Sequence, residues 1–434
     1  MESSSGSSLR QPPVTKKKQK TAINALNQDI LSMIFAFLDL VQLIRCSAVC
    51  KSWSTVIDKL KLLKIQYNRQ QQADSLSPAE SSSSSRRPIN IYLEQFAFEW
   101  HRSSLQRGPV NVFQWKGHSF GINQCRMKMG LILTGVGDKV MRLWSVESYR
   151  CLDEYSLPDR AALIDFDFDE GKVVGLAGTR ICIWTRSGTR NVFSSRDGMF
   201  TKGLCMRYVD PEAVVGCEDG KIRVFDMYSR KCSQIIKMHH GPITCLSFSE
   251  DQLLISGSSS GSISLSDLAS DQQVTTLKST GSAGIKTLCL NSRSHILFAG
   301  STDGHASCWD LRTLRRLWER RVSPNVLYSM NHLKNDTSTL VVGGLDGVLR
   351  ALDQDTGEVL SMYIMDEPSS SSNNSKDRHN VIEKKKVRRL AEDERIDALP
   401  VASRPSITCL AVGMQKVVTT HAEKYIRVWR FSNS

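Results

Sequence analysis

Cysteine and histidine are the residues of this 434-residue chain best suited to bind a metal or to act as a nucleophile or base. The chain holds 12 cysteines and 9 histidines. No two cysteines have C-x-x-C spacing, and no histidine follows Cys46 and Cys50 at the spacing of a zinc ligand. Most other cysteines lie in apolar runs such as ITCLSF (243–248), where a thiol behaves as a small apolar side chain. We therefore expect no metal, no cofactor and no disulfide framework.

Motifs of the common enzyme classes are missing from the sequence. It contains no glycine-rich phosphate loop before a helix, no G-x-S-x-G and no H-E-x-x-H. The pair His239-His240 precedes a strand-like apolar run and is better explained as part of the scaffold. We expect a protein that is not an enzyme.

Basic residues outnumber acidic ones and give a formal net charge of +13. The excess is dispersed, without the stripe of basic and aromatic side chains that is typical of nucleic-acid binding, so nucleic acid is not an expected partner. No apolar run is long enough to cross a bilayer or to serve as a secretory signal, so we expect no membrane association and a location in the cytoplasm or nucleus. Basic runs at residues 16–20 and 384–389 favour the nucleus.

Composition and patterning divide the chain into successive segments. The N-terminal tail and a later Ser-rich stretch are polar and of low complexity, which predicts disorder in the first and a linker in the second. Two further segments carry helical periodicity, and short apolar runs broken by Gly and Asp-Gly follow them. The boundaries are a tail at 1–21, a helical module at 22–67, a linker at 68–88, a linker helix at 89–109 and a β-rich domain at 110–434.

The β-rich domain repeats with a period of about 40–45 residues, which is typical of four-stranded propeller blades. The repeated position, near the end of an apolar run, is occupied by Trp144, Trp184, Phe225, Ser266, Trp309, Leu352 and Trp429. Seven such positions predict a mainly β fold with a seven-bladed β-propeller. An Asp-Gly or Ser-Gly pair precedes several of them at constant offset, as a hairpin turn with positive φ requires.

The chain ends shortly after Trp429, so the last blade lacks its fourth strand. Residues 110–116 (VNVFQWK) have no blade of their own and fit as that missing outer strand, which would close the ring and remove exposed sheet edges. The interval before the last blade is one period plus an excess of about 35 residues. The excess lies at 366–404, whose polar and charged composition predicts a disordered insertion.

The first blade resembles a WD repeat, the family in which His, Ser/Thr, Asp and Trp form a hydrogen-bonded chain within each blade. The matching residues are His118, Thr134, Asp138 and Trp144. Other blades are degenerate: the fourth keeps His240 and Ser256 but has serines at the Asp and Trp positions. The resemblance implies that these residues are structural.

Residues 26–53 (LNQDILSMIFAFLDLVQLIRCSAVCKSW) contain two apolar helical faces that a module of this size cannot bury completely by itself. Periodicity alone leaves open a helical hairpin packed on the propeller. The stretch resembles an F-box, except that Asn27 stands where that family usually has Pro. The matched positions are Leu26, Ile30, Leu31, Ile34, Phe35, Leu38, Leu43, Val49, Cys50, Lys51 and Trp53.

The order of F-box, linker and propeller resembles the F-box/WD-repeat proteins, which are substrate receptors of SCF-type ubiquitin ligases. The resemblance implies that the matched F-box residues bind the Skp-type adaptor of a cullin–RING ligase and that the propeller holds a protein substrate. Arginines beside the blade turns bind phosphopeptides in some members, but here those positions are Gly137, Glu218, Thr302 and Leu345. We therefore do not expect that kind of phosphate clamp.

Two alternatives compete with this interpretation. The tetrapeptide Trp309-Asp310-Leu311-Arg312 resembles the W-D-x-R motif of cullin-4-class ligase receptors, with Trp309, Asp310 and Arg312 as the ligase contact. So short a motif also arises in WD blades by chance. The other alternative is a propeller scaffold in an RNA- or chromatin-linked complex, in which the F-box segment is only structural.

Overall fold

The computed structural model describes most of the chain, in two compact units of residues 1–97 and 98–434. The described residues are 28–66, 69, 89–136, 140–157, 162–186, 190–192, 202–249, 251–268, 272–278, 281–365, 382–391, 394–400 and 403–432. The expected tail at 1–21 and linker at 68–88 therefore lie almost wholly outside the described residues.

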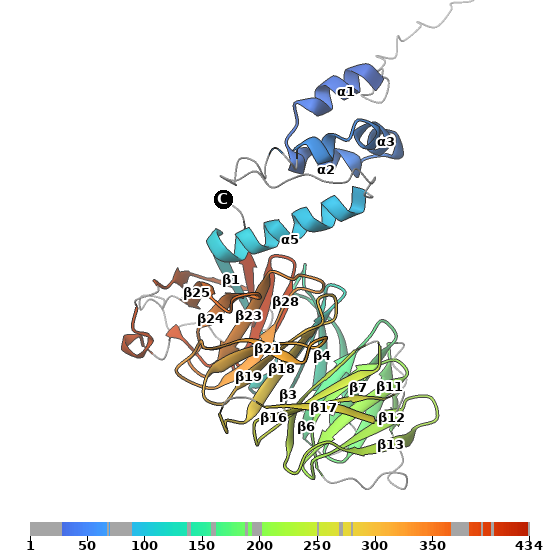
Figure 1. The fold of residues 1–434 in the computed structure, drawn as a ribbon, viewed down its shortest axis with the longest axis vertical. Helices are drawn as coiled ribbons and strands as arrows, with labels where there is room; N and C mark the ends of the chain where they lie inside the picture. The colour runs from blue at the N-terminus through green and yellow to red at the C-terminus, as the bar shows by residue number, and fades with distance from the viewer. Residues whose placement is uncertain are drawn as a thin grey trace, which may run out of the picture. The chain divides into compact units, whose positions relative to one another are not determined.

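The first unit is built from short helices (Figure 1). They are α1 (Gln28–Ala36), α2 (Leu40–Ser47) and α3 (Lys51–Lys59), followed by helical residues at 62–66 and by the start of α5 (Ile89–Arg107). Asp39 begins α2 with a reciprocal cap: its carboxylate accepts from the backbone N–H of Gln42 at 2.7 Å, and the Gln42 side chain accepts from the Asp39 N–H. Such a cap satisfies backbone donors that the helix leaves unpaired, and so fixes where α2 starts.

The second unit is a ring of seven antiparallel sheets, which confirms the predicted fold class. Blades 1 to 6 each run from the inner to the outer strand in chain order. Their strands are β2 (Ile122–Lys128), β3 (Leu131–Val136), β4 (Val140–Ser145) and β5 (Cys151–Ser156) in blade 1; β6 (Leu163–Phe168), β7 (Lys172–Ala177), β8 (Arg180–Thr185) and β9 (Arg190–Val192) in blade 2; β10 (Gly203–Val209), β11 (Glu212–Cys217), β12 (Lys221–Asp226) and β13 (Lys231–Lys237) in blade 3; β14 (Ile243–Phe248), β15 (Leu253–Ser258), β16 (Ser262–Asp267) and β17 (Gln272–Lys278) in blade 4; β18 (Ile285–Asn291), β19 (Ile296–Ser301), β20 (His305–Asp310) and β21 (Arg315–Arg321) in blade 5; and β22 (Leu327–Asn331), β23 (Thr339–Gly344), β24 (Leu349–Asp353) and β25 (Val359–Met365) in blade 6.

All seven repeated positions fall in the third strand of their blades, from Trp144 in β4 to Trp429 in β30 (Tyr425–Phe431). The turns before them behave as expected. Gly220 has φ 75° and Gly304 has φ 87°, a region that suits glycine because it has no Cβ.

Blade 7 joins the two ends of the domain and confirms the predicted closure of the ring. Its inner strands are β28 (Cys409–Gly413), β29 (Lys416–Thr420) and β30, and β1 (Val110–Lys116) pairs with β30 from Val110↔Phe431 to Lys116↔Tyr425. In Figure 1, β1 accordingly lies beside the red strands of the chain's end. Val112 and Trp115 are buried, so β1 contributes core as well as hydrogen bonds.

The prediction of a disordered insertion at 366–404 is wrong for the part that the structure describes. Residues 383–385 form β26 (Glu383–Lys385), which pairs with β1, and residues 387–389 form β27 (Val387–Arg389), which pairs with β25. A short 3-10 helix, Ile396–Ala398, follows. Leu390 is buried in a small cluster with Val348 and Ile364. We call residues 382–390 the strap, because they add a fifth strand to each of two neighbouring blades.

The C-terminal half of α5, from Phe98 onward, belongs to the propeller unit. Leu105 is buried in the core of blades 6 and 7. His101 is fully buried and accepts a hydrogen bond from the backbone N–H of Gln415 at 3.0 Å. Arg102 forms an ion pair with Asp353 at 2.7 Å. This half-helix therefore covers the loops between the first and second strands and the turns after the third strands.

In the described part of the chain, no helix is both long and apolar enough to span a membrane. Nor do His, Cys, Asp or Glu side chains gather there in a group of three that could hold a metal ion. All 12 cysteines are free thiols.

Candidate functional site

Helix α1 presents apolar side chains on two faces. Leu31 and Phe35 point into the core of the first unit and are 3% and 1% exposed. On another face, four apolar side chains remain in solvent. They are Ile30, Met33, Ile34 and Phe37, at 42%, 60%, 41% and 90% exposure. Ile30, Met33 and Ile34 lie on α1, and Phe37 lies in the turn directly after it. Their spacing of i, i+3, i+4 and i+7 is that of one helix face, and we call the four residues the α1 stripe.

The opposite face of α1 explains why the stripe stays outside. Phe35 packs edge-on against Trp53 of α3, with ring centroids 5.3 Å apart, and Leu43 of α2 is completely buried beside them. Once Leu31 and Phe35 fill this core, the helical period leaves Ile30 and Ile34 facing away from it. The first unit thus holds one face of α1 firmly and exposes the other.

The predicted adaptor-binding residues therefore divide into two groups. Leu31, Phe35, Leu43 and Trp53 are core residues, so their assignment as direct contacts is not compatible with their burial. Ile30, Ile34 and Val49 are exposed, the last at 62%. Leu38 and Cys50 are partly buried against the core, and Leu26 lies outside the described residues.

Met33 and Phe37 were not among the site residues predicted from the sequence. A signal was present in the sequence, because the two residues lie at i+3 and i+7 from Ile30, the spacing of one helix face. The sequence prediction did not include Met33 and Phe37, because it took only the positions that match the F-box pattern. Exposed apolar side chains gathered on one helix face usually mark an interaction surface.

The predicted hydrogen-bonded chain of blade 1 is present as far as the structure describes it. Thr134 Oγ1 accepts from Trp144 Nε1 at 2.9 Å and lies 2.9 Å from His118 Nε2. His118 and Trp144 are buried at 3% exposure each. Asp138, the fourth predicted member, lies outside the described residues. These side chains link strands within one blade and have no free surface to offer a ligand.

Blades 4 and 7 carry variants of the same chain. In blade 4 the partner of Ser256 Oγ is Nε2 of His239, at 2.9 Å, and not His240 as expected. His239 occupies the position four residues before the first inner-strand residue, as His118 does. In blade 7, Thr419 accepts from Trp429 Nε1 at 2.9 Å.

The W-D-x-R tetrapeptide lies at the end of β20. Trp309 is buried at 2% exposure. The Asp310 carboxylate accepts from the backbone N–H of Arg312 at 2.9 Å and from its Nε at 3.2 Å, and the Arg312 side chain is 66% exposed. Asp226 in blade 3 accepts from Tyr228 N in the same way although no arginine follows there. The contact of Asp310 is therefore explained by the turn alone, without binding to a ligase. Arg312 is the accessible residue of the motif.

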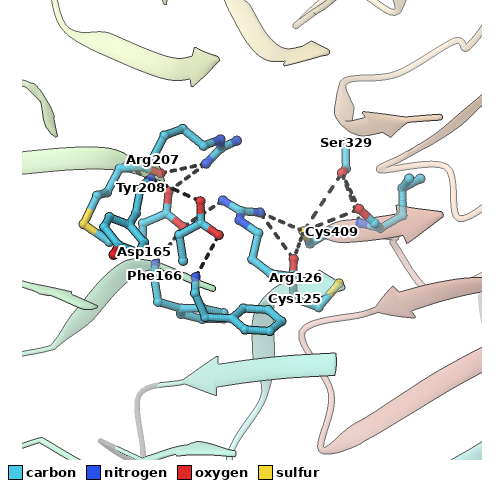
Figure 2. A network of polar contacts seen from close by, with 12 residues as sticks. Cys125, Arg126, Asp165, Phe166, Arg207, Tyr208, Ser329 and Cys409 are labelled. Carbon is cyan, nitrogen blue, oxygen red and sulfur yellow. Dashed lines mark hydrogen bonds and ion pairs between the residues drawn. The ribbon is translucent and has the colours of Figure 1, made fainter. Parts of the chain in front are cut away.

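Charged side chains of three inner strands meet within the propeller, a feature that was not predicted from the sequence. Figure 2 shows Asp165 of β6 between Arg126 of β2, at 2.9 Å, and Arg207 of β10, at 3.4 Å. The same carboxylate accepts from the backbone N–H groups of Phe166 and Met206, each at 2.9 Å. Asp165 thus ties together the inner strands of three blades.

Neighbouring contacts show the same pattern. Asp167 is buried and forms an ion pair with Lys128 at 2.7 Å; burial raises the pKa of this carboxyl, but Lys128 and Arg126 outweigh burial and hold the pKa below its usual value. Cys409 Sγ lies 3.3 Å from the backbone oxygen of Cys125 (Figure 2). Because each of these polar groups already has a partner on an adjacent strand, we interpret the network as a structural tie of the ring. In the sequence, such a network would be indicated by a polar residue that recurs at the same position of successive inner strands.

Comparison with known proteins agrees with both units. The F-box domain family matches residues 23–65, and the family described as WD domain, G-beta repeat, matches residues 230–267 and 271–310. An F-box/WD-40 repeat-containing protein of Arabidopsis thaliana is 52% identical over 96% of this chain and 97% of its own length. The human angio-associated migratory cell protein is 23% identical over 62% of this chain and 65% of its own length.

A solved structure resembles the propeller in fold alone. The computationally designed Ika8 protein superposes with a TM-score of 0.53 at 17% identity, over 73% of this chain and 98% of that protein. The similarity to the Arabidopsis protein extends over nearly the whole chain, with F-box and propeller in the same order, and is the informative one.

Proposed function

The chain belongs to the F-box/WD-40 repeat-containing proteins, and from this membership we propose that it is a substrate receptor of an SCF-type ubiquitin ligase. In this proposal the F-box binds a Skp-type adaptor, the adaptor connects it to a cullin–RING core, and the propeller binds the protein to be ubiquitinated. The chain itself performs no chemistry. It raises the effective concentration of substrate near the ligase's catalytic subunits.

The α1 stripe is the observation that carries the proposal. Met33 and Phe37 are 60% and 90% exposed, although a small helical unit would gain about 25 cal/mol for each Å² of apolar surface it buried. A surface of this kind is kept exposed when another protein covers it. Exposed apolar anchors at i, i+3, i+4 and i+7 are also the usual way in which a helix binds in a partner's groove.

The test is capture of a purified Skp-type adaptor by the full-length chain. Phe37→Asp replaces the most exposed side chain of the stripe, so it removes an apolar anchor without touching the core of the unit. If Phe37 is a central anchor, adaptor affinity should fall by roughly thirtyfold or more, because such residues contribute about 2 kcal/mol or more. Circular dichroism should be unchanged.

Leu60→Asp is the matched control, because Leu60 is an exposed apolar side chain of the same unit that does not belong to the α1 stripe. It should bind the adaptor as the unchanged chain does. Phe35→Ala, in contrast, should unfold the unit, since Phe35 is 1% exposed. If the unchanged chain captures no adaptor, the SCF proposal is wrong. If Phe37→Asp captures the adaptor normally, the α1 stripe is not the adaptor contact.

A further inference from the structure

Three blades carry an ion pair at one position of the fold. In each, an acidic residue in the turn between the second and third strands pairs with an arginine four residues later in the third strand. The pairs are Asp219–Arg223 at 2.9 Å, Asp346–Arg350 at 2.5 Å and Glu423–Arg427 at 2.6 Å. Each of these blades thus has two long charged side chains beside the turn.

Blade 4 lacks both members of this pair. Ser264 lies opposite Ser256 in the sheet register, as Arg223 lies opposite Val215 in blade 3. Ser260 precedes Gly261, which has φ 80°, as Asp219 precedes Gly220. Ser260 and Ser264 therefore stand where blades 3, 6 and 7 have an acid and an arginine, and two small hydroxyls take the place of two long charged side chains.

A hollow of ≈ 600 Å³ lies at this place. Its walls come from the end of β13, the loop that follows it, the turn before β16, and β17. Lys237, His240 and Lys278 line it, and all three are exposed, while none of the lining residues that the structure describes is acidic. Among the described residues, no ion-pair partner is present for Lys237 or Lys278, so their charge faces the hollow without a protein counter-ion.

Hydroxyl groups supply the remaining polar surface. His239 holds Ser262 Oγ at 2.9 Å through Nδ1 and Ser256 Oγ at 2.9 Å through Nε2. Ser260 Oγ lies 2.6 Å from Ser258 Oγ and 3.4 Å from Ser262 Oγ. Burial lowers the pKa of His239, which favours a neutral ring that orients these hydroxyls and adds no charge. Hydroxyl hydrogens can rotate to donate to an acceptor placed in the hollow.

We propose that this hollow of blade 4 binds an anionic side chain of a peptide, so that the propeller recognises an acidic segment of the protein it holds. Two lysines and a row of hydroxyls match the needs of a carboxylate or a phosphoryl group, which accept several hydrogen bonds and gain from unpaired cations. The site differs from a clamp of arginines, because its space arises from the loss of an arginine. The inference rests on the propeller being the substrate-binding unit of the proposed function.

The experiment measures binding of a fluorescent hexaglutamate peptide to the full-length chain by anisotropy, with a hexaglutamine peptide as the uncharged probe and a phosphoserine peptide as the phosphoryl probe. Ser260→Asp combined with Ser264→Arg rebuilds the ion pair of blade 3 in blade 4. It leaves the net charge unchanged and fills the hollow. Binding of the anionic peptides should fall by roughly tenfold or more. A preference between the two anionic peptides identifies the carboxylate or the phosphoryl group as the natural ligand.

A second pair of variants guards against misfolding of that double mutant. Lys237→Gln removes a cation from the hollow, and Lys231→Gln removes one from the other end of the same strand, β13. We expect weaker binding only for Lys237→Gln. Equal weakening by both, or unchanged binding after the ion pair is rebuilt, would overturn the inference. Adaptor capture does not involve blade 4, so failure here leaves the test of the α1 stripe separate.

Discussion

Arg350 donates to the carboxylate of Asp346 at 2.5 Å, and the two side chains are 1% and 0% exposed. Ser323 Oγ and the backbone N–H of Val348 also donate to this carboxylate, at 2.9 Å and 3.2 Å. The pair is thus removed from water and its acidic member is fully hydrogen-bonded. A charge left alone in such a place is costly, because neither water nor a counter-ion compensates it.

Arg350→Ala should therefore destabilise the propeller by about 3–5 kcal/mol, the usual cost of breaking a buried ion pair from one side. Arg223→Ala is the matched control, since its partner Asp219 is 23% exposed and water can replace the guanidinium. Its loss should be clearly smaller. Urea unfolding followed by tryptophan fluorescence measures both. Equal losses would mean that burial does not set the strength of this pair.

The propeller could be predicted from the sequence because its repeats restate the same pattern seven times. Trp144 and Trp429 lie in equivalent third strands. Residues 110–116 belong to no blade of their own, and only the last blade lacked an outer strand with which they could pair. The strap could not be recognised in this way. Glu383, Lys385 and Val387 alternate in burial with exposed Lys384, Lys386 and Arg388, but a strand made of charged residues has no apolar alternation to reveal it.

The α1 stripe shows a second limit of sequence reasoning. Ile30, Leu31, Ile34 and Phe35 are all apolar, and helical period alone cannot decide which of them faces the core. Leu31 and Phe35 face the core because they pack with Trp53 and Leu43, and that packing is known only once the unit is folded. The hollow of blade 4 has a similar origin, because it is recognised only when the positions of Ser260 and Ser264 are compared with the ion pairs that blades 3, 6 and 7 carry there.

Closure of the ring by β1 predicts different outcomes for two truncations. Removing residues 1–97 keeps the half of α5 that packs on the propeller and should leave a soluble monomer. Removing residues 1–116 also removes Val112 and Trp115 from the core and exposes the edge of β30, which should cause aggregation. Light scattering after size-exclusion chromatography compares them. A monomeric product from the shorter chain would contradict the role of β1.

The strap should contribute measurably to stability. Replacing residues 382–390 with a Gly/Ser stretch of equal length removes Leu390 from its cluster and the fifth strands from blades 6 and 7. We expect a loss of about 2–4 kcal/mol, most of it from the buried leucine. Replacing the exposed Lys384 and Lys386 of the strap with serine is the control and should change little, because surface substitutions usually stay within about 0.5 kcal/mol. Indistinguishable unfolding midpoints would show that the strap is not needed.

Arg312→Ala tests the competing ligase motif. The Arg312 side chain is 66% exposed and its ion pair with Asp310 is at the surface, so the stability change should stay within about 0.5 kcal/mol. Capture of the Skp-type adaptor should be unaffected. Affinity capture from cells, with quantification of both cullin classes, measures the outcome. Loss of all ligase association in this variant, with normal association of Phe37→Asp, would favour the cullin-4 class.

His101 should make the stability of the propeller depend on pH. Burial lowers the pKa of this imidazole from 6.5 to about 4, although Asp336 opposes the shift, and Nδ1 accepts a hydrogen bond from Gln415 that requires an unprotonated nitrogen. Between these two pKa values the unfolded chain binds a proton that the folded chain does not. Folding free energy is therefore lost as the pH falls from about 6.5 to about 4, by up to roughly 3 kcal/mol.

His101→Gln separates this contribution from those of other groups. A glutamine oxygen can accept from the Gln415 N–H but does not titrate, so the urea midpoint of the variant should fall less between pH 6.5 and pH 4.5 than that of the unchanged chain. His239 and His421, whose pKa values burial also lowers, and His332, whose pKa is raised to about 9, are present in both proteins and contribute equally to both slopes. The difference between the two slopes reports His101 alone. Parallel slopes would mean that its imidazole titrates normally in the folded protein, and that the half-helix carrying it opens readily from the propeller.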